Sequence, residues 1–191
     1  MEALYVRVDE VTQKIVDFNG FLYKMLSCSA ENDDPFDTLV SVEVSGDVEV
    51  GDVLCIENCK IVHIDPDLYY TRIAIRADKV SKCEKTQPIS KYYNIPFIGR
   101  IKTNERNKPK EFGPDRKKFY TVPIHLQETI TTNENPDKKT FSIMLMSFGS
   151  KTKLLQEFPN HSIIRGTATL KHKPKTKKYS LALISAELYE S

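Results

Sequence analysis

Apolar and polar residues alternate with a period of two along most of the chain, which predicts β-strands. In the first half the alternating segments are short, rich in β-branched and aromatic residues, and bounded by Gly, Asn, Asp or Pro; they cover residues 4–8, 39–44, 53–56 and 71–76. Val50-Gly51-Asp52-Val53-Leu54 predicts a turn that enters a strand, and Glu57-Asn58 predicts a hairpin tip. We expect four to six strands in residues 1–85, with little or no helix.

The second half repeats this layout more cleanly. The pattern predicts strands at about 95–103, 119–131, 140–148, 162–170 and 179–188, with a turn at 133–137. Residues 150–158 carry the only good helical pattern of this half, which starts at Ser150 as N-cap and is stopped by Pro159. The predicted order is three strands, one helix and two further strands.

Five strands with one helix between the third and fourth, in roughly 100 residues, is the layout of the OB-fold. In this order, and in the turn at 50–54, the chain resembles the tandem OB-fold proteins that bind single-stranded DNA, of the replication protein A and telomere-end-binding type. The resemblance covers both halves, the first more loosely. It implies a mostly β protein with two five-stranded Greek-key barrels, the second with a helix between strands three and four. An SH3-like barrel or a piece of a β-sandwich fits the same pattern and stays open.

Charge divides the chain as clearly as the strand pattern does. The net charge of the 191 residues is only +2, but residues 1–85 hold 9 Lys and Arg against 17 Asp and Glu, a balance of −8, whereas residues 86–191 hold 19 against 9, a balance of +10. We therefore expect an acidic OB-like domain at 1–85, a linker at 86–94 and a basic OB-fold domain at 95–191. Such asymmetry points to binding of nucleic acid or acidic partners by the basic part.

No run of about 18 apolar residues is present, and the N-terminal residues are charged where a signal peptide would be apolar. We expect no membrane association and a nuclear or cytoplasmic protein that is not secreted.

In an OB-fold the ligand lies across strands two and three, between the loop that joins strands one and two and the loop that joins strands four and five. The strongest basic runs of the sequence fall in these two predicted loops, at 104–118 and at 171–178, the second with five Lys in eight positions. Cations attract phosphate without reading sequence. A basic run between strands also fits a solvated turn, but here aromatic residues interleave, and exposed rings stack on unpaired bases for about 1–3 kcal/mol each.

The alternation also sorts the two strands across which a ligand would lie. In 119–127 it places Tyr120, Val122, Ile124 and Leu126 in the barrel interior, and Phe119, Thr121, His125 and Gln127 toward the groove. The third strand is ambiguous, because Phe141, Ile143 and Leu145 compete with Met144, Met146 and Phe148 for the core. We expect one of Phe141 and Phe148, not both, to stack on a base. The candidate nucleic-acid-binding residues are Arg100, Lys102, Arg106, Lys108, Lys110, Phe112, Arg116, Lys117, Lys118, Phe119, His125, Phe141, Phe148, Lys171, Lys173, Lys175, Lys177, Lys178 and Tyr179.

The sequence therefore predicts a non-catalytic protein that binds single-stranded nucleic acid, most simply DNA with RNA as an alternative. The acidic half repels phosphate and is expected to contact other protein subunits or a second copy of the chain; its one candidate basic stripe is Arg72 and Arg76 with Lys79, Lys82 and Lys85. The alternative function is a protein-docking subunit of a DNA replication, repair or telomere assembly.

No catalytic constellation is evident, and we expect no enzyme activity and no cofactor. Asp65, Asp67 and Asp78 resemble a nuclease pattern only superficially, since Asp78 and Lys79 are adjacent and would face opposite sides of a strand. A metal site is also unexpected, because the four Cys include no C-x-x-C pair, and His125 and His172 lack companions at ligand spacing.

Overall fold

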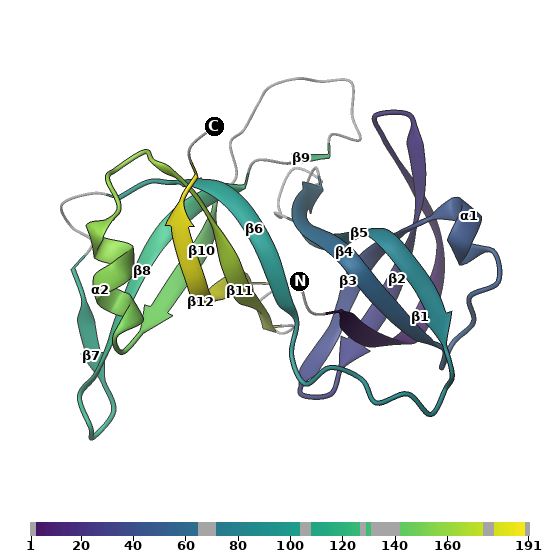
Figure 1. Ribbon diagram of the computed structural model, residues 1–191, viewed down its shortest axis with the longest axis horizontal. Helices are drawn as coiled ribbons and strands as arrows, with labels where there is room; N and C mark the ends of the chain where they lie inside the picture. Colours follow the sequence, from purple (N-terminus) through teal and green to yellow (C-terminus); the bar gives the residue numbers. More distant parts are fainter. Residues whose placement is uncertain are drawn as a thin grey trace. The chain divides into compact units, whose positions relative to one another are not determined.

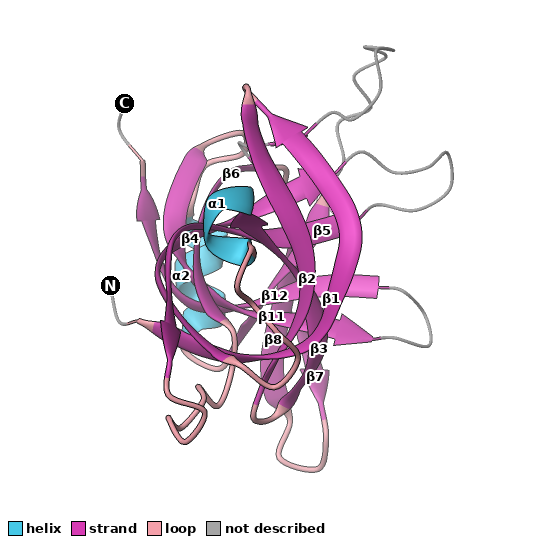
Figure 2. Ribbon diagram, turned by 90° about the vertical axis from the view of Figure 1, so that its right-hand side faces the viewer, coloured by secondary structure: helices cyan, strands magenta, loops and turns pink. Residues whose placement is uncertain are grey.

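The computed structural model describes residues 3–64, 72–103, 108–126, 129–130, 142–173 and 178–189. Contacts divide the chain into two compact units (Figure 1). The described residues up to Tyr93, together with Thr129 and Ile130, belong to the first unit, and the other described residues from Asn94 onward belong to the second. Strands make up most of both units, as Figure 2 shows. No helix in the described ranges is long and apolar enough to cross a membrane.

The first unit is a closed five-stranded barrel. Its elements are β1 (Leu4–Phe18), β2 (Phe21–Ala30), β3 (Asp33–Ser41), the short helix α1 (Val42–Ser45), β4 (Val53–Ile64) and β5 (Arg72–Cys83). The strand order β1-β2-β3-β5-β4 closes by pairing of β1 with β4, and only the β3–β5 pair within this ring is parallel. A two-residue strand, β9 (Thr129–Ile130), adds in parallel to the end of β4.

The predicted turn before β4 is confirmed, whereas the predicted hairpin tip at Glu57-Asn58 is wrong. Gly51 has a φ of 88°, a left-handed backbone conformation that glycine adopts more readily than other residues, and β4 begins two residues later. The strand then runs through Glu57 and Asn58, where its register with β5 shifts twice. A β-bulge leaves residues unpaired and bends the strand. The bulge in β4 therefore places two exposed polar residues, Glu57 and Asn58, between two apolar runs, as a turn would.

The segment after β5, which was predicted as a linker, lies along the first barrel. The N–H of Ser90 donates to the Tyr5 carbonyl at 2.8 Å, and the N–H of Tyr5 donates to the Ser90 hydroxyl at 2.9 Å. Tyr93 is buried, and its hydroxyl donates to the carbonyl of Cys28. These contacts attach the chain to the first unit as far as Tyr93.

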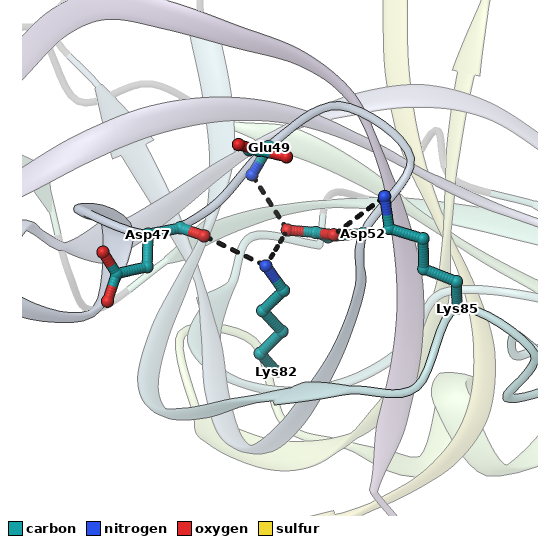
Figure 3. A network of polar contacts seen from close by, with 5 residues as sticks. All are labelled: Asp47, Glu49, Asp52, Lys82 and Lys85. Carbon is teal, nitrogen blue, oxygen red and sulfur yellow. Dashed lines mark hydrogen bonds and ion pairs between the residues drawn. The ribbon is translucent and has the colours of Figure 1, made fainter.

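Asp52 has a buried carboxylate that interacts with Lys82 near the end of β5 and with Lys85 just after it (Figure 3). Lys82 Nζ lies 2.6 Å from Asp52 Oδ2, and Lys85 Nζ lies 3.6 Å from Oδ1. The N–H of Glu49 donates to the same carboxylate at 2.9 Å, and Lys82 also donates to the carbonyl of Asp47. The hydrogen bond from Lys82, followed by that from Glu49, holds the pKa of Asp52 below its ordinary value of 3.8.

We expect Asp52→Asn to destabilise the first unit by about 1–3 kcal/mol at neutral pH, because the amide loses the charge that Lys82 and Lys85 face. The folded pKa of Asp52 is lowered, so its contribution is present above the unfolded value and is lost as pH falls through the folded value. Urea unfolding of both proteins at neutral and acidic pH measures this. The difference should shrink in acid, and a difference that stays constant with pH would contradict the charged interaction.

The second unit is also a closed five-stranded barrel. Its elements are β6 (Asn94–Ile101), β7 (Lys110–Phe112), β8 (Lys117–Leu126), β10 (Ile143–Phe148), α2 (Lys151–Glu157), β11 (Ile163–Lys173) and β12 (Lys178–Leu188). The ring β6-β8-β10-β12-β11 closes on β6, and β10 and β12 pair in parallel. As predicted, α2 lies between the third and fourth barrel strands in chain order, β10 and β11. Ser150 occupies its N-cap position without a side-chain capping bond.

Both units therefore share one topology, in which strand one pairs with strands two and four and strand three pairs in parallel with strand five. This is the five-stranded Greek-key barrel of the OB-fold, and the predicted fold class is confirmed. The strand β7 was not anticipated. It forms a hairpin with β8 inside the predicted basic loop of the second unit.

Candidate nucleic-acid interface

The outer face of β8 and β10 in the second unit is where an OB-fold ligand would lie. On β8 the interior set predicted from alternation is confirmed, since Tyr120, Val122, Ile124 and Leu126 are all buried. On β10 the structure resolves the ambiguity. Ile143 and Leu145 are buried, whereas Met144 and Phe148 are 39% and 41% exposed. The apolar surface of β10 that faces outward is therefore the one that ends in Phe148.

Three phenylalanines meet at one end of this face, and we call Phe112, Phe119 and Phe148 the Phe triad. The ring centroid of Phe112 lies 5.5 Å from that of Phe119 and 6.0 Å from that of Phe148, both edge to face. Phe119 and Phe148 lie 6.5 Å apart with an angle of 27° between their planes. Phe112 and Phe148 are each more than 40% exposed, so the triad presents ring surface to solvent.

Strand register places two lysines on the face that carries the Phe triad. Phe119 lies opposite Phe148 on β10 and opposite Lys110 on β7, while Phe112 lies opposite Lys117. Directly opposed residues of antiparallel strands share a face, so Lys110 and Lys117 flank the rings. Both lysines are exposed. In the described ranges no ion pair engages either of them.

The tight turn of the β7–β8 hairpin makes this arrangement possible. Gly113 has a φ of 72° and Arg116 a φ of 47°, and the N–H of Arg116 donates to the Gly113 carbonyl at 3.2 Å. The turn folds β7 back onto β8 and so brings Phe112 over the outer face. Lys118 lies on the opposite face of the hairpin with Glu111.

Two further cations lie on the same edge of β8 as β7, toward the other end of the strand. Arg100 on β6 is directly opposite His125 and therefore shares its outer face, and the N–H of Lys102 donates to the carbonyl of Pro123 at 3.0 Å. Both Arg100 and Lys102 are exposed. The outer face of β8 thus has positive charge at both ends of the edge that faces away from β10, from β6 at one end and from the β7–β8 hairpin at the other.

The end of β11 and the start of β12, which flank the second predicted loop, lie at the opposite end of β10 from the Phe triad. Met144 near the start of β10 is beside Ser180 near the start of β12, where the β11–β12 hairpin ends. The ring of His172 stacks on that of Tyr179, with centroids 4.6 Å apart and planes 10° from parallel. By strand register, His172 and Tyr179 lie on the same inward face as the buried Leu170 and Leu181, whereas Lys171 lies on the outward face.

The structure thus brings together one subset of the predicted residues and separates others from it. Lys110, Phe112, Lys117, Phe119 and Phe148 form one surface, with Arg100, Lys102 and His125 further along it.

Other predicted residues lie elsewhere. Tyr179 lies against His172, and Lys173 is opposite Lys178 near the ends of β11 and β12. Lys108 and Arg116 are exposed beside the hairpin. Four predicted residues lie outside the described ranges: Arg106, Phe141, Lys175 and Lys177.

Met144 and Met146 were not among the predicted site residues, although they form the outer face of β10 between the Phe triad and the β11–β12 hairpin. Alternation identified them as one of two possible faces. It could not decide between the faces because both are apolar.

In the predicted basic stripe of the first unit, the cations whose side chains are described pair with carboxylates. Arg76 is only 7% exposed; its Nε donates to Asp78 at 2.8 Å, and its guanidinium lies 4.9 Å from the ring of Phe18. Lys79 pairs with Glu57, and Lys82 and Lys85 pair with Asp52. The side chain of Arg72 lies outside the described set.

Among the described residues, no three His, Cys, Asp or Glu come together in a way that could hold a metal ion. Burial raises the pKa of both Cys28 and Cys59 to about 12, which keeps these thiols protonated and unreactive.

Comparisons with known proteins agree with this architecture at the level of the fold. The sequence matches no protein-family model and no curated protein. The structure is similar to that of a deletion mutant of the single-stranded DNA binding protein from Thermus aquaticus, with a TM-score of 0.64 and 10% identity over 99% of this chain and 94% of that one. The wild-type Thermus protein gives a TM-score of 0.63 and 9% identity, covering 99% and 92%. The tandem arrangement of two OB barrels is thus found in a single-stranded DNA-binding protein across nearly its whole length.

Proposed function

We propose that this protein binds single-stranded DNA on the outer face of β8 and β10 in its second unit, without catalysing a reaction. The observation that carries the proposal is the Phe triad, which is exposed and flanked by Lys110 and Lys117 on the same face. Similarity to the Thermus single-stranded DNA binding protein supports the same ligand.

The chemistry of the surface favours unpaired nucleotides over a duplex. Exposed aromatic rings offer stacking to any base whose face is free, and a duplex hides those faces between its own base pairs. Lysines beside the rings attract the phosphates that connect successive bases. Capture by charge followed by stacking predicts little sequence preference, because every base has an aromatic face.

We expect the protein to bind single-stranded DNA more tightly than duplex of the same length, with a steep dependence on salt. Fluorescence anisotropy with matched single-stranded DNA, single-stranded RNA and duplex at two salt concentrations tests this. The logarithm of the binding constant should fall with the logarithm of salt concentration by about 0.7 for each neutralised phosphate. Lys110→Gln and Lys117→Gln should each reduce that slope by up to the same amount, with Lys151→Gln on α2 as the control.

Each outcome separates the candidate functions. Equal affinity for duplex and single strand would contradict the stacking contribution, and tighter binding of RNA would assign RNA as the ligand, because the 2′-hydroxyl is the group that distinguishes the two. Failure to bind any of the three would contradict the proposal and favour a protein-docking subunit, the alternative predicted from the sequence.

A further inference from the structure

We infer that the first unit closes its own ligand face, so that each chain binds one strand segment on the second unit only. The inference rests on the proposed function and deepens it by specifying the ligand: a segment of single-stranded DNA no longer than one OB-fold covers.

Register identifies the outer face of β2 and β3 in the first unit, the counterpart of β8 and β10 in the second. Cys28 lies opposite Val8 and Phe36, and all three are buried in the barrel interior. Residues of the other parity therefore face outward, and these include Met25 and Leu39, which lie opposite each other. Both are nevertheless buried, at 1% and 0% exposed. The surface on which a ligand would lie is thus already covered.

Apolar side chains from three other strands pack against Met25 and Leu39. Val16 comes from the end of β1, Val62 and Ile64 from the end of β4, and Ala74 from the start of β5; all belong to one buried cluster, against which Phe18 and Tyr23 also pack. In an OB-fold the loops after strands one and four are the two that hold the ligand. Here the strand ends that lead into those loops contribute to a hydrophobic cluster in the place of a ligand.

The same face of the second unit is open. Met144 and Phe148 on its outer surface are 39% and 41% exposed, against 0–2% for the six members of the cluster in the first unit. Uncovering the first face would return buried aliphatic surface to water, which opposes binding. The second face can accept bases without losing an internal contact of this kind.

Charge opposes binding at the first unit as well. Arg76 lies on the outer face, opposite Leu39, but it is paired with Asp78 and stacked on Phe18. Lys79, Lys82 and Lys85 each face a carboxylate. A phosphate would have to compete with these carboxylates in a segment with a net charge of −8.

One residue offers a sharp test of this inference. Phe21 is 69% exposed at the tip of the β1–β2 hairpin and lies opposite Phe18 on the outer face. If the first unit bound DNA, Phe21 would be the ring best placed to stack on a base. Like Phe148, Phe21 is an exposed phenylalanine, and neither ring belongs to a buried core, so both Phe→Ala variants should fold.

The experiment measures affinity and stoichiometry of the full chain with oligothymidylates of increasing length. One OB-fold covers about 4–16 nucleotides. We expect affinity to reach its plateau within this range and a second chain to bind when the length is doubled. Phe148→Ala should lose at least about fivefold in affinity at every length, whereas Phe21→Ala should bind as the unmodified protein does. Thermal unfolding of both variants checks that each is folded.

Two results would overturn the inference while leaving the proposed function intact: a continued rise of affinity beyond one barrel's length at one chain per strand, or a loss of affinity in Phe21→Ala. If the unmodified chain binds no oligomer of any length, the proposed function fails, and this inference fails with it.

Discussion

Replacing Phe148 by Ala is expected to weaken the binding of single-stranded DNA by about 5-fold to 150-fold, the range that loss of one base–aromatic stacking contact represents. Phe148 contacts both other rings of the Phe triad, and its exposed surface ends the outer face of β10. Its removal therefore eliminates one stacking surface and leaves Phe112 and Phe119 with less support. Anisotropy with a fluorescent oligothymidylate at fixed salt measures the loss.

Matched variants separate stacking from general disturbance of the hairpin. Phe148→Tyr keeps the aromatic face and should retain affinity for single-stranded DNA. Phe148→Leu keeps apolar bulk without a π-system and should lose most of the affinity that Phe148→Ala loses. Phe112→Ala combined with Phe148→Ala should deviate from additivity, because the two rings are in contact. Equal affinity of the Ala and unmodified proteins would show that the triad is not the stacking site.

Replacing Gly166 by Ala is expected to destabilise the second unit by about 3 kcal/mol, and with it to reduce the fraction of chains that bind DNA. A Cβ added at Gly166 would overlap the backbone carbonyl oxygen of Ser185 and come within 2.9 Å of Cα of Ala186. Both obstacles are backbone atoms of β12, the neighbouring strand, so no side-chain rotation relieves them. The strain arises next to the register shift at Thr167, where β11 and β12 approach closely.

Gly46→Ala is the control for this substitution. Gly46 has a helical φ of −58° at the end of α1, and an added Cβ would meet no atom within 4 Å. It should be neutral or stabilising by up to about 1 kcal/mol, through reduced freedom of the unfolded chain. Urea unfolding of the two variants compares them. An unchanged midpoint for Gly166→Ala would mean that β11 and β12 can separate without cost.

Alternation predicted the inner face of β8 correctly because its two faces differ in polarity. Tyr120, Val122, Ile124 and Leu126 alternate with residues that include Thr121 and His125, and burial of the apolar set leaves one register. The same reasoning failed to choose a face on β10, where Ile143 and Leu145 alternate with Met144 and Met146. Both sets are apolar, so packing in the closed barrel had to decide which set entered the core.

The predicted hairpin tip at Glu57-Asn58 shows a different limit. A β-bulge and a turn both put exposed polar residues between two apolar runs, and only the continuous pairing of β4 with β5 tells them apart. The extra strand β7 escaped prediction for a related reason. Its three residues are too few for periodicity, and it exists because the turn at Gly113 folds it onto β8.

The sequence by itself determined that the protein is built from strands and that a helix separates the third and fourth strands of the second half, because both features depend on local periodicity. It also determined that one half is acidic and the other basic, because this difference depends only on counts of charged residues. Only the tertiary structure decided which charges are available. Lys82 and Lys110 look alike in the sequence, but the pairing of β5 with β4 brings Lys82 to Asp52, whereas the β7–β8 hairpin leaves Lys110 exposed beside the Phe triad. Whether a cation meets a carboxylate, and whether a strand face meets other side chains, depends on strand register and barrel closure, which join residues far apart in the chain.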